Sequence, residues 1–258
     1  MAFAATDICA ATQNNAPALP ANASAAWVSN VLDGDTVQLA DGRRVRLLGI
    51  NTPEIQHANR AAEAGGTAAK QWLLQKIMHR PVSVVGDVEA TDKYGRTLAY
   101  LFSQDNELIN QQLLAHGLAT LNLYPPNLQF ATALENAQQQ AERQQVGIWQ
   151  RPEYAPISML AVETLAATDE TLSQRWLRVH GRLQAIRYTA KSVYLEFTPH
   201  LHARIDRQWL ALFPDLQHYQ GKSLELRGWL HTHQGQLSLL LRHPSAIKII
   251  ASPTGNVP

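Results

Sequence analysis

The sequence of 258 residues predicts a mainly β protein with added helices, an α+β fold built as two consecutive barrels. Three observations lead to this prediction. Short runs in both halves alternate apolar and polar residues, as half-buried strands do. In each half, one helical stretch interrupts the strands. A proline-containing segment at 151–156 separates the halves, and the chain is long enough for two hydrophobic cores.

The first half, residues 27–150, has the pattern of a five-stranded OB barrel with helical additions. Thr67 follows two glycines and is the expected cap of the first helix, and Gly117 and Gly147 are the expected helix stops. We expect strands at 28–39, 43–50, 82–85 and 98–102, and helices at 67–79, 107–116 and 128–145. The barrel prediction follows from strands that one helix interrupts and further helices close.

The second half, residues 165–250, repeats that order and predicts a second, OB-like barrel of the nucleic-acid-binding type. We expect strands at 176–187, 193–198, 223–230 and 236–242, with helices at 161–173 and 207–213. The remaining segments are expected to be an N-terminal tail at 1–26, a linker at 151–164 and a C-terminal tail at 251–258.

Oxygen-bearing side chains of a metal-binding type gather in two motifs of the first half, DGDT at 33–36 and RLLGINTPE at 46–54. A hairpin turn at 40–43 joins the two runs, so we expect both motifs at one end of the barrel. Asp35, the Asn51 side-chain carbonyl and the Thr52 backbone carbonyl are hard oxygen ligands. They suit Ca²⁺ or Mg²⁺ rather than a soft metal.

Phosphate-binding groups accompany these ligands. Arg46 offers a planar fork that can hold phosphate oxygens, and Arg96 in the segment TDKYGR at 91–96 brings a second guanidinium. Glu54 follows the stiff Pro53 and is placed to accept the proton of an attacking water. Two guanidinium groups and a divalent cation together can offset the charge that develops on a phosphorus under attack. This set of residues predicts phosphodiester cleavage.

The motifs DGDT, RLLGINTPE and TDKYGR with LAY after it, and the closing GIW at 147–149, resemble the thermonuclease family of staphylococcal or micrococcal type. The resemblance covers about residues 27–150. It implies a Ca²⁺-dependent endonuclease, with Mg²⁺ or Mn²⁺ as alternative ions, that hydrolyses accessible or single-stranded DNA and RNA and leaves 3′-phosphates. The roles it implies are metal ligands at Asp35 and Thr52, phosphate clamps at Arg46 and Arg96, a base at Glu54, terminal-phosphate contacts at Lys93 and Tyr94, and a sugar or base contact at Tyr124.

Asn51 departs from the family pattern, which has an aspartate as the second metal ligand. The amide oxygen can still coordinate Ca²⁺, but one formal charge is lost and affinity should fall with it. Two classes of function therefore stay open. The first is a metal-dependent nuclease, and the alternative is a catalytically weakened, nuclease-like protein that binds nucleic acid or acts as a scaffold.

Charge is distributed unevenly between the halves. Residues 27–150 carry 10 Lys and Arg against 12 Asp and Glu, whereas residues 151–258 carry 12 against 8. At a net charge of +1, the protein must bind nucleic acid through local patches rather than its overall field. The expected patch in the second half consists of Arg178, Arg182, Tyr188 and Lys191. The alternative is an ordinary solvated sheet face.

The N-terminal residues and the cysteine content indicate the cellular location of the protein. The single cysteine, Cys9, excludes an intrachain disulfide, and no apolar run is long enough for a membrane span. Ala2-Phe3-Ala4 has the small-x-small pattern that signal peptidase cleaves. We therefore expect a periplasmic or secreted protein, with a cytoplasmic location left open. Oligomeric state does not follow from the sequence.

Overall fold

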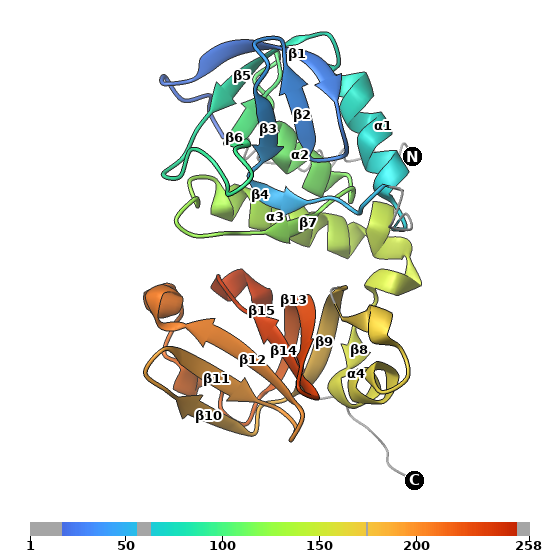
Figure 1. Cartoon of the computed structure of the whole chain (residues 1–258), viewed down its shortest axis with the longest axis vertical. Coiled ribbons are helices and arrows are strands. Elements are labelled where there is room, and N and C mark those ends of the chain that lie inside the picture. Colours follow the sequence, from blue (N-terminus) through green and yellow to red (C-terminus); the bar gives the residue numbers. More distant parts are fainter. Residues whose placement is uncertain (1–16, 56–62, 174, 252–258) are drawn as a thin grey trace, which may run out of the picture.

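The computed structural model describes residues 17–55, 63–173 and 175–251. Cys9 and the expected cleavage segment Ala2-Phe3-Ala4 lie outside the described residues. Within the described part, every helix is too short or too polar to cross a membrane. The chain forms two bodies, with the first part of the sequence in the upper body of Figure 1 and the last part in the lower body.

The first body contains a closed five-stranded barrel with the strand order β1-β2-β3-β6-β5. Its strands are β1 (Ser24–Val31), β2 (Thr36–Leu39), β3 (Arg44–Leu47), β5 (Pro81–Val85) and β6 (Thr97–Phe102). β1 pairs first with β5 and then with β2, so one continuous strand closes the ring. The β3–β6 pair is parallel and the other pairs are antiparallel. The OB barrel predicted for this half is confirmed.

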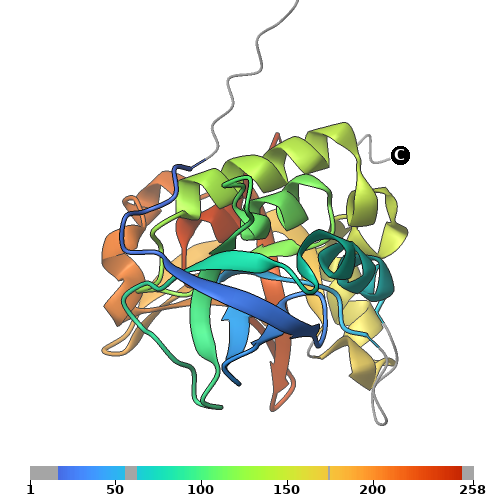
Figure 2. The same ribbon diagram turned by 90° about the horizontal axis from the view of Figure 1, so that it is seen from above.

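Helices pack around this barrel and connect it to the site. They are α1 (Gly66–Ile77), α2 (Ile109–Ala115) and α3 (Ala131–Gln144); in Figure 2, α2 and α3 lie together on one side of the strands. Tyr100 is fully buried, and Phe130 packs edge-on against it with ring centroids 4.8 Å apart. The buried Asn110 amide donates to Leu48 O at 2.8 Å and accepts the Leu101 N–H at 3.0 Å. These two bonds hold α2 against the end of β3, where the candidate site begins.

The second body repeats the strand order of the first. Its main strands are β9 (Trp176–Arg182), β10 (Ala185–Tyr188), β11 (Ser192–Glu196), β12 (Leu201–Asp206), β13 (Ser223–His233) and β14 (Gln236–Leu240). They pair in the order β10-β11-β12-β14-β13-β9, again with one parallel pair, β12–β14. Between β9 and β10 the Leu183 N–H donates to the β13 side, at Lys222 O, and the Gln184 N–H to the β11 side, at Glu196 O. The first strand therefore changes partners as β1 does, which agrees with the predicted OB-like barrel.

Three predicted strands are each split in the structure. The strand expected at 43–50 is divided at Leu48 into β3 and β4 (Gly49–Asn51). The strand expected at 28–39 is divided into β1 and β2, because the Asp33 side chain accepts the Asp35 N–H at 3.0 Å and forms a local turn in place of ladder bonds. The strand expected at 176–187 is divided into β9 and β10 at its change of partner. Periodicity within one strand does not reveal such breaks, since the apolar alternation continues across them.

Other boundaries also differ from prediction. The first helix begins at Gly66, after Gly65 with a φ of 105°, so Thr67 is inside the helix and does not cap it. The helix expected at 207–213 is a 3₁₀ helix, Arg207–Leu212. β1 begins inside the expected N-terminal tail. The expected linker contains structured elements. The strands that the sequence does not predict are β7 (Thr120–Asn122), which pairs with β4, and β8 (Ile157–Ser158), β12 and β15 (Ile247–Ile249).

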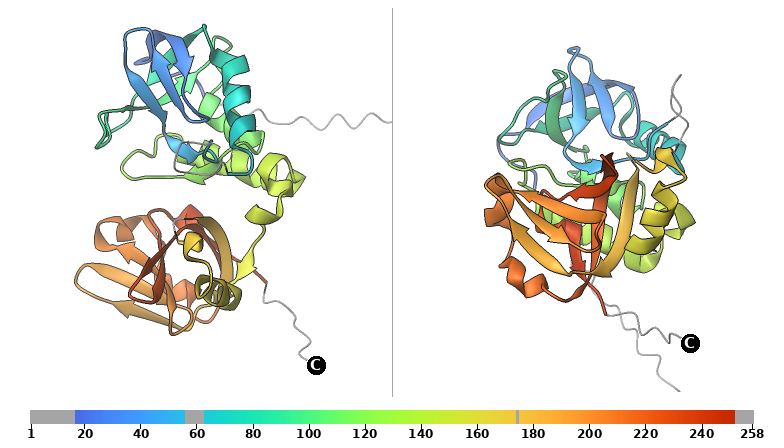
Figure 3. Two further views of the ribbon diagram at one scale, coloured as in Figure 1. Left: turned by 45° about the vertical axis from the view of Figure 1, so that its right-hand side comes forward. Right: turned by 60° about the horizontal axis from the view of Figure 1, so that its bottom comes forward.

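The two bodies meet along α3, which runs on the side of the first body that faces the second (Figures 1 and 3). Glu142 of α3 accepts hydrogen bonds from Arg227 of β13, one of them at 2.8 Å from Nη2. Glu225 accepts two bonds from Arg178, at 2.9 and 3.0 Å, and one from Arg227 at 2.8 Å. These four side chains are 6–13% exposed, so the contact is a buried ionic network.

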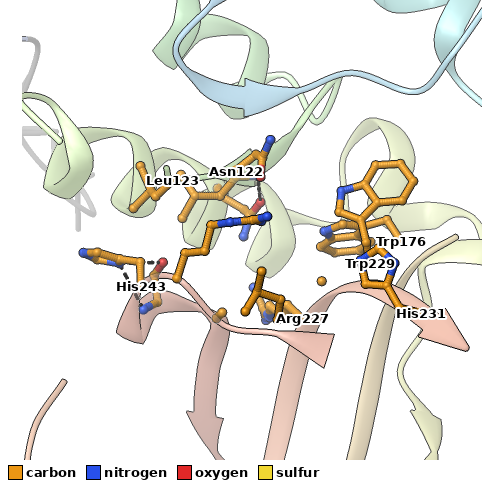
Figure 4. A pocket seen from close by; sticks show the side chains of 14 residues that line it. Asn122, Leu123, Trp176, Arg227, Trp229, His231 and His243 are labelled. Carbon is orange, nitrogen blue, oxygen red and sulfur yellow. Dashed lines mark hydrogen bonds between the residues drawn. The ribbon is translucent and has the colours of Figure 1, made fainter. Parts of the chain in front are cut away.

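A small cavity of about 50 Å³ lies at the same boundary (Figure 4). Asn122 and Leu123 line it from the first body, while Trp176, Trp229 and His243 line it from the second. Its size leaves room for water rather than for a nucleotide. We therefore read it as part of the packing between the bodies.

Candidate active site

The turn after β1 and the end of β4 meet at one end of the first barrel. Asp35 is buried, and its Oδ2 accepts the Thr52 N–H at 2.9 Å. Gly34 makes this approach possible, because a Cβ there would lie 2.6 Å from Thr52 Oγ1 and 2.8 Å from the Ala69 Cβ of α1. A larger residue at position 34 would force the two segments apart. The DGD sequence thus serves packing as well as chemistry.

Arg46 of β3 lies between these two segments, where its side chain donates three hydrogen bonds and forms one ion pair. Nη1 donates to Leu47 O at 2.6 Å and Ile50 O at 3.0 Å. Nη2 lies 2.9 Å from Asp35 Oδ2 and 3.1 Å from Asn51 Oδ1. Burial raises the pKa of Asp35, and the neighbouring charge of Arg46 opposes that shift. A positively charged nitrogen therefore stands where two of the predicted metal ligands converge.

The oxygens at this point fit a hard cation. Asp35 Oδ2 and Asn51 Oδ1 both contact Arg46 Nη2, and Asn51 Nδ2 donates to Thr52 O at 3.1 Å. All three predicted ligands therefore belong to one connected hydrogen-bond network. Carboxylate, amide and peptide oxygens are the donors that Ca²⁺ and Mg²⁺ take. Within the described part of the chain, His, Cys, Asp and Glu side chains form no group of three or more that could hold a metal. Amide and carbonyl oxygens would have to complete the ligand set.

Glu54 is held against the start of α1 by its backbone. Its N–H donates to Glu63 Oε2 at 3.0 Å, and its carbonyl accepts the Glu63 N–H at 2.8 Å. Gly66 packs directly on this backbone, since a Cβ there would lie 2.5 Å from Glu54 O and 2.7 Å from Pro53 O. The helix start therefore fixes the peptide that carries the Glu54 carboxylate.

Arg96 closes the turn before β6. Asp92 Oδ1 accepts the backbone N–H groups of Tyr94 at 2.9 Å and Arg96 at 3.0 Å, and Oδ2 accepts Arg96 Nε at 2.8 Å. Burial favours the protonated form of Asp92, but these hydrogen bonds outweigh it, and the pKa of Asp92 is lowered. The ionised Asp92 thus sets the direction of the Arg96 side chain.

One pocket of about 260 Å³ brings these groups together. The residues that line it are Asp33, Asp35, Arg46, Asn51, Thr52, Pro53, Glu54 and Arg96. All six residues predicted as catalytic or metal-binding are in this set. Asp33 is an additional lining carboxylate that sequence reasoning did not select. Its place two residues before Asp35 in DGDT was the available signal.

The three predicted substrate contacts are placed differently from one another. Tyr94 is 72% exposed, with Lys93 Nζ 5.0 Å from its ring centroid. Tyr124 lies outside the pocket, at the boundary between the bodies. Its ring meets Trp209 edge-on at 6.1 Å, and the Arg242 guanidinium lies 4.4 Å from its centroid. Tyr124 is therefore engaged by the second body.

The four residues predicted to bind nucleic acid in the second half do not form one patch. Arg178 belongs to the buried network through its two bonds to Glu225. Tyr188 and Lys191 are exposed on either side of the β10–β11 turn. Arg182 is also exposed, but it ends β9, on the far side of β10 from that turn. We leave Arg178 out of the surface proposed below, because burial in an ion pair removes it from solvent.

A closed OB barrel with a carboxylate-and-guanidinium pocket at one end places the first body among the staphylococcal nuclease homologues, whose family model matches residues 44–151. Thermonuclease from Staphylococcus intermedius is 40% identical over 127 residues, which are 48% of this chain and 75% of that protein. Thermonuclease from Staphylococcus hyicus is 33% identical over 132 residues, 50% and 78% of the two chains. Endonuclease YncB of Bacillus subtilis is 28% identical over 132 residues, 49% and 62%. The chain belongs to the thermonuclease family.

Proposed function

We propose that this protein is a metal-dependent nuclease that hydrolyses phosphodiester bonds of DNA and RNA with water and leaves 3′-phosphates. The observation that carries the proposal is the single pocket that holds Asp35, Glu54 and two guanidinium groups, Arg46 and Arg96. A module that only attracts phosphate has no need of carboxylates in the same pocket. The related proteins named as thermonucleases and endonucleases support the same reading.

Each residue then has a chemical role. Arg46 and Arg96 hold the equatorial oxygens of the phosphate and stabilise the charge that grows on them. Glu54 takes the proton of the attacking water or orients that water. Asp35, Asn51 and Thr52 would hold the cation, for which we propose Ca²⁺. When bound, such an ion neutralises phosphate charge as a Lewis acid. Lys93 and Tyr94 extend the contacts toward a terminal phosphate.

One assay tests the proposal directly. Single-stranded DNA and RNA are incubated with Ca²⁺, with Mg²⁺ and with chelator, and the product ends are identified by their sensitivity to a 3′-phosphatase. We expect cation-stimulated degradation that chelator abolishes and products that carry 3′-phosphates. Intact substrate with every cation, or products with 3′-hydroxyls, would contradict the proposed reaction.

The second candidate function is a weakened nuclease barrel that binds nucleic acid or serves as a scaffold. Asn51 favours it, because an amide supplies one negative charge fewer than an aspartate at the predicted metal site. The position of Arg46 Nη2, 2.9 Å from Asp35 and 3.1 Å from Asn51, also means that a cation must compete with a guanidinium. A measurement of cation affinity therefore distinguishes the two candidate functions.

The Asn51→Asp substitution is expected to tighten Ca²⁺ binding. Few charged ligands predict affinity near the weak end of oxygen-ligand sites, a Kd on the order of 10⁻³ M for the native chain. An added carboxylate should lower that Kd and, at fixed Ca²⁺, raise Tm, because a ligand that binds the folded state stabilises it. Calorimetric titration and thermal unfolding measure both effects.

Asn30→Asp, an exposed change on β1 away from the pocket, is the matched control. If neither protein binds Ca²⁺ at several millimolar and neither cleaves, the scaffold reading is the better one.

For the second body we propose a role in holding the strand, through Arg182, Tyr188 and Lys191. Arg207 joins this group: its guanidinium lies 5.7 Å from the Tyr188 ring and its Nε donates to Thr189 O at 3.1 Å. Exposed aromatic rings beside cations are typical of single-strand binding surfaces. Because the group is exposed, it can be altered in the full chain without disturbing either core.

The triple variant Arg182→Gln, Tyr188→Ala, Lys191→Gln is expected to bind long single strands more weakly. Loss of two phosphate contacts should reduce the slope of log K against log salt by about 1.4, at about 0.7 for each single-strand contact. Cleavage of short oligonucleotides should be unaffected. Fluorescence anisotropy over a salt series measures the slope, with Arg175→Gln as an exposed control in the same body. An unchanged slope would make the second body a structural or protein-contact domain.

A further inference from the structure

The strand pair β4–β7 lies on the side of the first body that faces the second (Figure 1), and β4 ends in the candidate active site. The register of the pair sets Asn51 of β4 opposite Thr120 of β7. Asn51 lines the active-site pocket, whereas Thr120 does not. Thr120 is buried, at 3% exposed, and its Oγ1 donates to Asn51 O at 3.2 Å. A residue outside the pocket thus contacts the backbone of a predicted metal ligand.

The peptide between Asn51 and Thr52 is held from both sides. Its carbonyl accepts the Thr120 hydroxyl at 3.2 Å, and its N–H donates to Asp35 Oδ2 at 2.9 Å. The two residues that this peptide joins supply two of the predicted cation ligands, Asn51 Oδ1 and Thr52 O, and Asp35 is the third. Hydrogen bonds at the carbonyl and the N–H of one peptide polarise it in the same sense, so each strengthens the other. The Thr120 hydroxyl therefore acts on the whole ligand set through a single peptide.

The strand β7 presents this hydroxyl from a fixed position. The next N–H of β7, from Leu121, donates to Gln138 Oε1 of α3 at 2.6 Å, and Gln138 is 3% exposed. Leu121 is paired with Ile50, whose carbonyl accepts Arg46 Nη1 at 3.0 Å. A β-branched side chain is also restricted at χ1, so the hydroxyl of Thr120 has few alternative directions. A buried amide of α3 thus fixes the strand that carries Thr120.

We propose that Thr120 is a positioning residue of the cation site: its hydroxyl fixes the Asn51–Thr52 peptide and so sets the direction of the ligand oxygens on both residues. The inference rests on the proposed nuclease function and deepens it, because it adds a residue that touches neither cation nor substrate. Asn51 supplies an amide where an aspartate would add a charge, so affinity depends more on ligands that are already held in place. Ligands ordered before binding do not lose conformational freedom when the cation arrives.

Calorimetric titration of Ca²⁺ into the full chain tests this role. Thr120→Val deletes the hydroxyl and keeps the branched shape of the side chain. We expect its Kd for Ca²⁺ to rise about fivefold, on the scale of one net hydrogen bond. Thr120→Ala, a second variant without the hydroxyl, should show a similar rise. Thr120→Ser keeps the donor and should restore most of the affinity.

A second readout needs neither cation nor turnover. In chelator, hydrogen exchange at the Thr52 amide, which is bonded to Asp35, should be about fivefold faster in Thr120→Val than in the native chain. Ser29→Ala is the matched control, because it removes a hydroxyl that donates to a cross-strand carbonyl, Gln38 O, at 3.1 Å in the same barrel but outside the pocket. It should change neither Ca²⁺ affinity nor exchange at Thr52.

A lower Tm in Thr120→Val with unchanged Ca²⁺ affinity and unchanged Thr52 exchange would make Thr120 a structural residue only and overturn the proposal. An equal loss of affinity in Thr120→Ser, or a native chain that binds no Ca²⁺, would also overturn it. If the native chain cleaves but Thr120→Val binds Ca²⁺ as tightly, the positioning role fails and the nuclease proposal stands. If Thr120→Val binds Ca²⁺ more weakly but the native chain does not cleave, the positioning role stands and the nuclease proposal fails.

Discussion

Replacing Arg46 with alanine is expected to lower turnover at least about 10²-fold, the scale found when one charge-stabilising donor is removed from an active site. The residue is central because its fork reaches both Asp35 and Asn51 while two backbone carbonyls fix its plane. Arg46→Lys should recover little, since one ammonium group cannot reproduce a planar fork. Initial rates on single-stranded DNA with saturating Ca²⁺ measure the effect.

Cation binding separates a chemical role of Arg46 from a structural one. Removing the guanidinium takes positive charge away from Asp35, so Ca²⁺ affinity of Arg46→Ala should be kept or increased while turnover falls. Loss of both would indicate a collapsed site. Circular dichroism and Tm verify the fold, because Asp35 would lose a buried partner.

Arg96→Ala is expected to show a loss of similar size, for the same reason. Its guanidinium lines the pocket and is oriented by Asp92, so the two substitutions remove two separate positive charges from the same pocket. Arg80→Ala, exposed and outside the pocket, should leave the rate unchanged. Undiminished turnover in both Arg46→Ala and Arg96→Ala would contradict the nuclease assignment.

Much of the site could be predicted because its residues come from short, local motifs. DGDT and the Asn51–Glu54 segment each carry neighbouring ligands, and a hairpin turn between them dictates that they converge. The strand breaks could not be predicted in the same way. The turn at Asp33 depends on a side chain that bonds to its own backbone, and the apolar alternation gives no sign of it.

The contact between the two bodies was beyond sequence reasoning for a different reason. Glu142 and Arg227 are 85 residues apart, and each looks like an ordinary charge on the polar face of a helix or strand. The alternating pattern around Arg178 accordingly predicts a solvent-facing, positively charged side chain. Its burial follows from the docking of α3 on the second barrel, which no local pattern encodes. Tyr124, predicted to contact substrate, packs edge-on against Trp209 of the second body while its side chain stays about half exposed.

Glu142→Gln is expected to destabilise the protein by about 3–5 kcal/mol, the usual cost of removing one partner of a buried ion pair. Arg227 is 9% exposed and would lose its carboxylate partner on α3, while burial alone opposes its charge. The affected contact joins the two bodies, so we expect their unfolding to separate into two transitions. Urea titration followed by circular dichroism and calorimetry measures both the loss and the separation.

Glu135→Gln on the same helix is the matched control, because it makes the same charge change at a residue whose side chain bonds to Gln139 within the helix. It should shift stability by less than about 0.5 kcal/mol. A Glu142→Gln protein as stable as the native chain would show that the ionic network contributes specificity rather than stability. A single unchanged transition despite the full loss would show that the two bodies unfold as one unit for other reasons.

The same network predicts how stability responds to acid. Burial favours protonated Glu225, but its bonds to Arg178 and Arg227 outweigh burial and lower its pKa. A carboxyl group with a lowered folded-state pKa stabilises the fold above its unfolded pKa of about 4.3 and loses that contribution as pH falls through the lower value. The native chain should therefore lose stability below about pH 4, as Glu225 becomes protonated and its bonds to Arg178 and Arg227 weaken. Glu225→Gln should be less stable at neutral pH, and its stability should fall less steeply between about pH 5 and pH 3. An identical slope in the two proteins would place the acid response outside this network.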